Sequence, residues 1–212
     1  MAKESLKNLG VAFPKSKQGR AEQSLSNLVE AAEKIVATGD AMGFNARTLA
    51  KVSGYSLGSL VQRLGKVENI FLHAIAFGRT KQLKELAQQI ESFGSDKTAD
   101  QYAEFIVGLS LSRIPVVGAQ VIRYYESRAM GRTNNVSNIH AYTDEMIPTL
   151  NKIIAQDKTG TLRKVPTYEM KYLARSIFHI LERPFAEGDP EAGSAAHRAM
   201  AIHHISRLLS AE

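Results

Sequence analysis

The residues that offer recognisable chemistry gather between positions 45 and 66, in the run NARTLAKVSGYSLGSLVQRLGK. Gln62 and Ser59 can contact base edges, since glutamine pairs bidentately with adenine and serine is permissive. Leu57 can touch a thymine methyl group. The cations that can bind phosphate oxygens are Arg47, Lys51, Arg63 and Lys66. These residue types together predict contact with duplex DNA, whereas the plainer interpretation is the exposed polar surface of a small helical bundle.

Two short helices joined by a tight turn would position these side chains. Asn45 can cap the first helix, because its side chain can accept a hydrogen bond from a free backbone N–H. Gly54 suits the turn, since glycine takes a positive φ without steric cost. Ser56 can cap the second helix, whose apolar residues recur at helical spacing: Leu57, Leu60, Val61 and Leu64. The pattern predicts a helix-turn-helix, a motif whose second helix lies in the DNA major groove.

The predicted DNA contacts combine these side chains with the free N–H groups at each helix start. The full set is Arg47, Ser56, Leu57, Ser59, Gln62, Arg63 and Lys66.

Charge is concentrated at the same end of the 212-residue chain, whose net charge is +6. Residues 1–66 hold ten Lys/Arg against five Asp/Glu, and the remaining 146 hold 17 against 16. An excess of cations beside the motif suits a phosphate-binding surface. Residues 1–20 contain Gly10, Pro14 and Gly19 and are expected to form a flexible basic arm. That arm either follows DNA, as some N-terminal arms do, or is solvated without function.

The composition excludes several other classes of protein. With no cysteine, the chain has neither a disulfide framework nor a thiolate metal site. No apolar run reaches the roughly 18 residues of a membrane span, and the first residues lack the apolar core of a secretory signal. A cytoplasmic location without a membrane partner is therefore expected.

Helical periodicity continues along the rest of the chain, and no segment shows the alternation of a strand. The expected helices cover residues 21–38, two segments within 45–66, 67–92, 98–130 with a break or kink at Pro115, 136–156 with a bend at Pro148, 167–183 and 191–210. We therefore predict an all-α fold of about nine helices. Its parts are the arm (1–20), a three-helix DNA-binding domain (21–66) and a helical effector-binding and dimerisation domain (67–212).

The run over residues 31–75 resembles the tetracycline-repressor (TetR) family of bacterial transcription regulators. The matching features are Ala31-Ala32, Gly39, Asn45, Leu49-Ala50, Gly54, Ser56, Gly58, Leu60 and the stretch from Glu68 to Ile70. Where the family usually has a Leu-Tyr-x-His/Tyr-Phe run, this chain has Leu60-Val61-Gln62-Arg63-Leu64. The lysine usual before Glu68 is replaced by Val67, with Lys66 one position earlier.

This resemblance implies a homodimeric repressor that binds an operator through two recognition helices. An effector entering the middle domain would shift the fourth helix and separate those two helices. The final two helices would form the dimer interface, here through Ile177, Leu181, Ile202, Ile205 and Leu209. Aromatic, polar and apolar residues of the middle helices that could line an effector cavity, or belong to an ordinary core, are Phe105, Leu109, Tyr124, Tyr125, His140, Tyr142 and Met146.

Two alternatives remain at this stage. Val61, Leu64 and Val67 suit a helical small-molecule-binding or protein-interaction protein that has lost specific DNA recognition. A helical enzyme has less support, because no GxxxxGK[ST], GxSxG or HExxH motif occurs. His197 and His204 lie two helical turns, roughly 10 Å, apart, too far for one metal ion by themselves. No cofactor, metal or catalytic residue is therefore expected, and the identity of the effector stays open.

Overall fold

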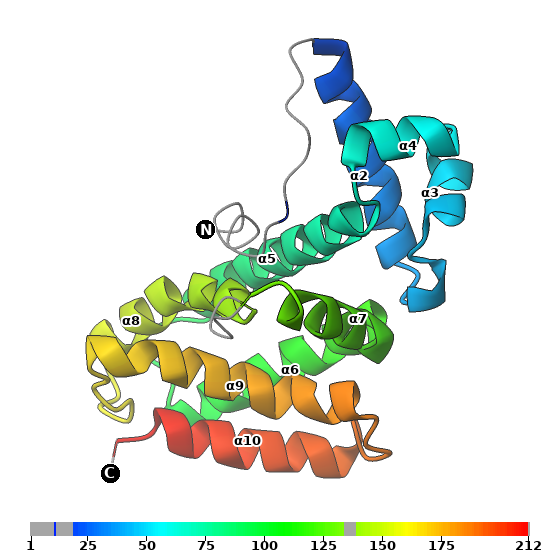
Figure 1. The fold of residues 1–212 in the computed structure, drawn as a ribbon. Coiled ribbons are helices and arrows are strands. Elements are labelled where there is room, and N and C mark those ends of the chain that lie inside the picture. Colours follow the sequence, from blue (N-terminus) through cyan, green and yellow to red (C-terminus); the bar gives the residue numbers. More distant parts are fainter. Residues whose placement is uncertain (1–10, 12–18, 134–138, 212) are drawn as a thin grey trace. The chain divides into compact units, whose positions relative to one another are not determined.

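Helices form most of the chain in a computed structural model, which describes residues 11, 19–133 and 139–211. The nine α-helices of these residues are α2 (Gly19–Val36), α3 (Ala46–Ser53), α4 (Leu57–Leu64), α5 (Glu68–Ser92), α6 (Ala99–Val117), α7 (Ala119–Met130), α8 (Ile147–Ala155), α9 (Thr167–Glu187) and α10 (Ala195–Leu209) (Figure 1). Two 3₁₀ turns, η1 (Ala41–Gly43) and η3 (Ala141–Met146), complete them. The all-α prediction is confirmed. The predicted basic arm lies outside the described residues, apart from positions 11, 19 and 20.

The break predicted at Pro115 is wrong by a few residues. Helix α6 continues to Val117, and the chain turns at Gly118, which has a φ of +74°. A Cβ atom at Gly118 would lie 3.2 Å from the backbone of Gly39. Position 118 therefore requires glycine for two reasons. Its backbone is left-handed, and a side chain would clash with the backbone of Gly39.

The helix predicted over residues 136–156 is also wrong in its first half. Residues 134–138 lie outside the described part, residues 141–146 form η3, and the α-helix begins only at Ile147. Pro148 stands in the first turn of α8 rather than at a bend. A proline is tolerated there, because the first N–H groups of a helix have no partner inside it.

The last two helices differ from the predicted bounds at the loop between them. Helix α9 continues past Arg183, includes Pro184 and ends at Gly188, whose φ is +77°. Helix α10 starts at Ala195, because the Ser194 side chain accepts a hydrogen bond from the N–H of His197 at 3.2 Å. The end-capping residues, rather than proline or the apolar pattern, set these boundaries.

The chain divides into two compact units. Unit 1 comprises residues up to 79 together with 116–142, and unit 2 comprises residues 80–115 together with 143–212. Helix α5 therefore contributes its first half to unit 1 and its second half to unit 2. Helix α7 belongs to the same unit as α2, α3 and α4, although about 50 residues separate it from α4 in the sequence.

The core of unit 1 joins α2, α3 and α4 to the first half of α5 and to α7. Phe44 stacks on Phe71 with ring centroids 5.3 Å apart and meets Tyr124 of α7 edge-on at 5.0 Å. Burial, and to a lesser degree the nearby Glu68 carboxylate, raises the pKa of Tyr124 to about 12. Aromatic packing thus fixes α7 against the segment that leads into α3.

An ionic cluster at the start of α5 adds a second link to α7. Glu68 pairs with Arg128 at 3.2 Å and with Arg132, whose guanidinium also donates to the Asn69 side chain at 2.6 Å. The side chains of Glu68 and Arg132 are both largely covered, so solvent screens this pair less than an exposed one. The first turn of α5 follows α4 after three residues, so the cluster holds the end of the helix-turn-helix.

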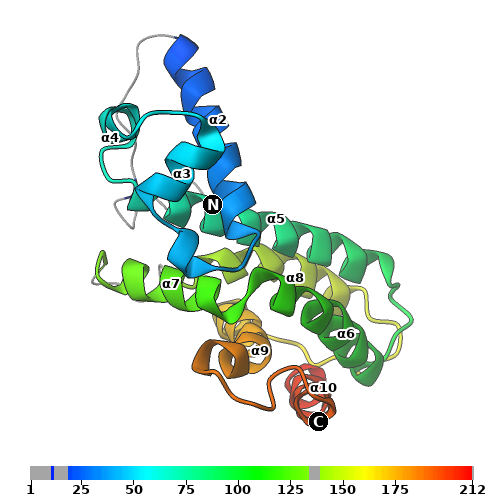
Figure 2. The ribbon, with the colours of Figure 1, turned by 90° about the vertical axis from the view of Figure 1, so that its right-hand side faces the viewer.

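In unit 2, α9 and α10 run side by side, as both ribbon views show (Figures 1 and 2). Buried His197 of α10 accepts a hydrogen bond from the N–H of Gly193 at 2.9 Å, and its other ring nitrogen lies 3.1 Å from the carbonyl oxygen of Ile180. His197 is therefore part of the packing between these helices. No single helix of the described residues is both long and apolar enough to cross a bilayer.

Candidate DNA-binding surface

The first helix of the predicted motif is held by Asn45. Its side-chain oxygen accepts hydrogen bonds from the N–H groups of Arg47 and Thr48, both at 3.0 Å, and its amide donates to the Met42 carbonyl at 2.9 Å. Three backbone polar atoms around the start of α3 are thereby paired through one side chain. The predicted N-cap is confirmed.

Gly54 and Ser56 set the turn into the second helix. Gly54 has a φ of +75°, and its N–H donates to the Ala50 carbonyl at 2.9 Å. The Ser56 hydroxyl accepts from the N–H of Ser59 at 3.2 Å and also lies 2.9 Å from the Ser59 hydroxyl. The predicted turn and cap are confirmed, and together they start α4 immediately after α3 ends.

Packing decides which side of α4 faces outward. Leu60 and Leu64 are buried completely or nearly so, and they lie one turn apart. Leu57 and Val61 lie at the edge of the same apolar stripe, yet they are 48% and 59% exposed. Helix α4 thus has one side in the core of unit 1, and the rest of its surface is exposed among the described residues.

Most of the predicted contact residues lie on the accessible surface. Ser59 and Arg63 are half-buried, and those that are exposed are Arg47, Ser56, Leu57, Gln62 and Lys66. The hydroxyls of Ser56 and Ser59 already interact with each other. The Ser59 hydroxyl would have to give up that local interaction to contact a partner, whereas the Gln62 side chain is exposed.

The segment that forms α3 and α4 carries charge of one sign. Between Asp40 and Glu68 the chain has no acidic residue, whereas it has Arg47, Lys51, Arg63 and Lys66. These four cations lie on α3, on α4 and directly after α4. Such a segment favours contact with a polyanion.

Arg63 has a positioning partner within the motif. Its guanidinium carbon lies 5.4 Å from the centroid of the Tyr55 ring, in the turn between α3 and α4. A cation over an aromatic ring is stabilised by about 0.5–1 kcal/mol at an exposed site. Tyr55 therefore restricts where the charge of Arg63 can lie, which a flexible arginine side chain would not do alone.

Comparison with solved structures identifies the architecture. A TetR-family transcription regulator from Marinobacter aquaeolei VT8 covers 91% of this chain and 98% of its own, with a TM-score of 0.52 and 17% identity. A candidate TetR-family transcriptional regulator from Mesorhizobium loti MAFF303099 covers 90% and 95%, with a TM-score of 0.56 and 12% identity. Another, from Shewanella sp. PV-4, covers 89% and 99%, with a TM-score of 0.54 and 17% identity. The chain has the fold of TetR-family regulators.

The sequence was also compared with family models and with curated proteins. No family model matches the chain, and no curated protein matches it. The likeness to the TetR fold is therefore one of three-dimensional structure, carried by sequences that share few identical residues.

The residues predicted to line an effector cavity are divided between the two units. Tyr124, Tyr125, His140 and Tyr142 belong to unit 1, and Phe105, Leu109 and Met146 belong to unit 2. The guanidinium of buried Arg79 lies over the Tyr142 ring at 3.9 Å and donates to its hydroxyl. Phe105 stacks on Phe93 with centroids 4.1 Å apart. Several of these side chains thus have packing roles within their own unit.

Two buried polar groups of α6 were missed at the level of sequence. The Ser110 hydroxyl and one terminal nitrogen of Arg113 are buried and have no hydrogen-bond partner among the described residues. They lie three positions apart, on one side of the helix. An unpaired buried polar atom lowers the stability of the folded protein by about 1–3 kcal/mol. A ligand with an acceptor group could pair with these atoms and remove that penalty.

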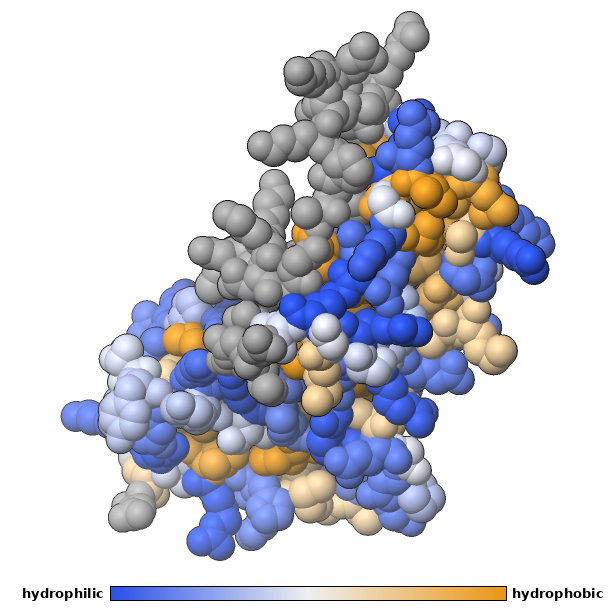
Figure 3. Space-filling view, in the orientation of Figure 1, coloured by the Kyte–Doolittle hydropathy of each residue, from blue (hydrophilic) through white to orange (hydrophobic). Residues whose placement is uncertain are grey.

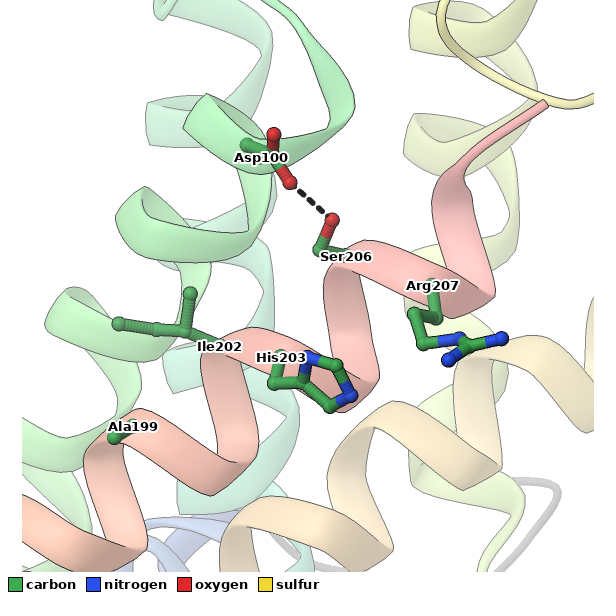
Figure 4. Close-up of a pocket in the computed structure, with 6 residues that line it drawn as sticks. All are labelled: Asp100, Ala199, Ile202, His203, Ser206 and Arg207. Atoms are coloured by element: carbon green, nitrogen blue, oxygen red, sulfur yellow. Dashed lines mark hydrogen bonds between the residues drawn. The ribbon is translucent and has the colours of Figure 1, made fainter. Parts of the chain in front are cut away.

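Four of the five predicted dimer residues already face the interior of their own chain. Leu181, Ile205 and Leu209 are at most 1% exposed and Ile177 is 3% exposed. Ile202 alone is half-buried, and it lines an open groove between α6 and α10 (Figure 4). There the Ser206 hydroxyl donates to the Asp100 carboxylate. None of the predicted effector residues lines this groove.

Metal ligands do not gather anywhere in the ranges that the structure describes. No group of three or more His, Asp or Glu side chains there could hold an ion.

The Arg63–Tyr55 contact makes a specific prediction. Replacing Arg63 with Ala should weaken DNA binding and reduce the slope of log affinity against log salt by about 1, since one phosphate contact is lost. Tyr55→Ala should weaken binding about two- to fivefold, because it removes only the ring that positions Arg63. Fluorescence polarisation at several salt concentrations measures both effects.

Tyr55→Phe is the matched control, because it keeps the ring and should retain wild-type affinity. An unchanged salt slope for Arg63→Ala would remove Arg63 from the phosphate contacts. Equal losses for the Phe and Ala variants would show that the ring does not act through Arg63.

Proposed function

We propose that the protein is a DNA-binding transcription regulator of the cytoplasm, a dimeric repressor released from its operator by a small hydrophobic effector. The observation that carries this proposal is the outward face of α4. Helix caps and buried leucines hold that face in place, and four cations without any acidic residue accompany it. A helix of this kind fits the major groove, where phosphates need cations and base edges need short side chains.

The domain organisation supports a switch. We assign DNA binding to residues 21–66, with the arm over 1–20 as an auxiliary contact, and effector binding and dimerisation to residues 67–212. Helix α5 follows α4 after three residues and belongs to both compact units. A change in the second half of α5 would therefore reach the first half through one continuous helix. By linkage, DNA would weaken effector binding by the same factor as the effector weakens DNA binding.

A dimer would use the outward sides of α9 and α10, because their inward sides are already packed. Helix α9 exposes two aromatic side chains one turn apart, Tyr168 at 76% and Tyr172 at 62%. Helix α10 exposes Met200 at 38%. An open groove between the helices is lined by Ser176, His179, Ile180, His204, Arg207 and Leu208. Exposed aromatic side chains beside a groove are typical of contact surfaces.

The effector is proposed to be a hydrophobic compound with a hydrogen-bond acceptor. Half-buried Phe105 and Leu109 of α6, in unit 2, suit an apolar body, and Arg113 with Ser110 of the same helix suits a carboxylate or carbonyl group. We assign the protein no catalytic role.

A second function is favoured by one observation. Leu57 and Val61 are exposed apolar residues of α4. Exposed apolar residues that lie together also occur at protein interfaces. The alternative is therefore a helical protein-interaction or small-molecule-binding protein without specific DNA recognition.

A titration with two duplexes separates these functions. The DNA upstream of the protein's own gene should bind about 10³-fold tighter than a random duplex. Both affinities should fall as salt rises from 50 to 200 mM, because cations release counterions from the phosphates. Equal affinity for the two duplexes would contradict the repressor proposal and favour the alternative.

The dimer surface is tested by Tyr172→Glu. A charge introduced at a packed interface should raise the dimer dissociation constant at least about tenfold, as judged by sedimentation equilibrium. Met130→Glu is the control, because Met130 is also 62% exposed but lies on α7 in unit 1. A Tyr172→Glu protein that stays as dimeric as the control would place the interface elsewhere.

The effector site is tested by native mass spectrometry of the purified protein. A co-purifying compound with an acceptor group is expected, and its occupancy should fall at least about fivefold in Arg113→Met, which loses a charge-assisted hydrogen bond. Operator affinity without effector should stay unchanged in this variant. Equal occupancy in both proteins would exclude Arg113 from the effector site.

A further inference from the structure

Helix α4 carries an exposed aliphatic pair, Leu57 and Val61, at the edge of the stripe whose Leu60 and Leu64 enter the core. Leu57 and Val61 are four positions apart, so their side chains lie one above the other on the same side of the helix. Both remain about half exposed, whereas Leu60 and Leu64 alone provide the buried contacts of α4. The space-filling view shows apolar surface at the α3–α4 end of unit 1, with hydrophilic residues beside it (Figure 3).

The helix is open around this pair. Gly58 lies next to Leu57, and a Cβ atom built on it would have no neighbour within 4 Å among the residues that the structure describes. The backbone of α4 is therefore uncovered at that point, and another surface can approach it closely. Gln62 is exposed directly after Val61. A partner that contacts Val61 would therefore also meet a side-chain amide.

The charges around the pair indicate what kind of partner fits. The cations are Arg47, Lys51, Arg63 and Lys66, and the segment from residue 41 to 67 has no acidic residue. An aliphatic pair in a segment whose charged residues are all cations matches the major groove of duplex DNA, whose floor carries base edges and whose rims carry phosphates. The apolar group on those base edges is the C5-methyl of thymine.

We propose that Leu57 and Val61 read thymine methyl groups and that Gln62 reads an adjacent adenine. The operator half-site would therefore be rich in A·T pairs at its centre. This inference rests on the proposed function and adds the base preference to it. Four residues of helix span about 6 Å, which corresponds to roughly two base-pair steps of duplex. Two thymines within one or two steps of each other should thus meet the two side chains.

Deoxyuridine provides the test, because it removes only the C5-methyl of thymine and leaves every hydrogen-bonding group in place. Duplexes that bind the full-length protein are first selected from a random library. Each thymine of the selected half-site is then replaced by deoxyuridine, and affinities are measured by fluorescence polarisation at one fixed salt concentration. Replacement at each of two positions should lower affinity about fourfold, because each removes one methyl group that the protein buries on binding.

The variants assign each methyl to a side chain. Val61→Ala should bind thymine and deoxyuridine equally at one of the two positions and still discriminate at the other. Leu57→Ala should show the reverse. Val52→Ala is the matched control, because Val52 is 45% exposed on α3 and should discriminate at both positions. All three side chains are exposed, so thermal melting should show folded proteins.

Three results would overturn the inference. If a selected duplex binds tightly and no deoxyuridine lowers its affinity, thymine reading fails while the proposed function stands. If the library yields no preferred sequence, the proposed function fails and the inference fails with it. If Val61→Ala instead disrupts self-association in sedimentation, the aliphatic pair contacts a second copy of the chain rather than DNA.

Discussion

The burial of Leu60 and Leu64 is the constraint on which the rest of the surface depends. Helix α4 has only eight residues, and its own hydrogen bonds would not keep it folded in water. Its stability comes from packing these two leucines into the core of unit 1. Once they are buried, the positions between them must face outward. The same contact that folds the helix therefore selects the residues it presents.

The helix caps and the turn fix which residues of α4 are buried and which are exposed. Asn45, Gly54 and Ser56 determine where α3 ends and where α4 begins, and a shift of one residue would rotate every side chain of α4 by about 100°. Leu60 would then leave the core and Val61 would partly enter it. The local hydrogen bonds and the apolar packing agree on one register, which is what allows so short a motif to hold a defined surface.

Helix α7 extends this support from outside the motif. Its Tyr124 meets Phe44 ahead of α3, and its Arg128 pairs with Glu68 after α4. The helix-turn-helix is thus contacted at both of its ends by one element that is distant in sequence. These packed contacts restrict the movement of α3 and α4 relative to α7, because close-packed side chains transmit displacements that a flexible linker would absorb.

The sequence alone determined the helical class, the helix-turn-helix and its caps, because these follow from local periodicity and from backbone preferences of single residues. Asn45, Gly54 and Ser56 act where they stand, and no distant residue is needed to interpret them. The predicted breaks were less accurate. Pro115 and Pro184 are both included in helices, and the chain turns at Gly118 and Gly188 instead.

Only the tertiary structure decided which apolar residues are core and which are surface. Leu57, Leu60, Val61 and Leu64 have the same pattern in the sequence, yet two are buried and two are about half exposed or more. The same holds for α9 and α10, where the family resemblance placed apolar Leu181 and Ile205 at a dimer interface although their own chain buries them. Periodicity identifies a stripe on a helix, but which of its residues are covered depends on neighbours that are distant in sequence. The role of Tyr55 beside Arg63 depends in the same way on the turn that brings them together.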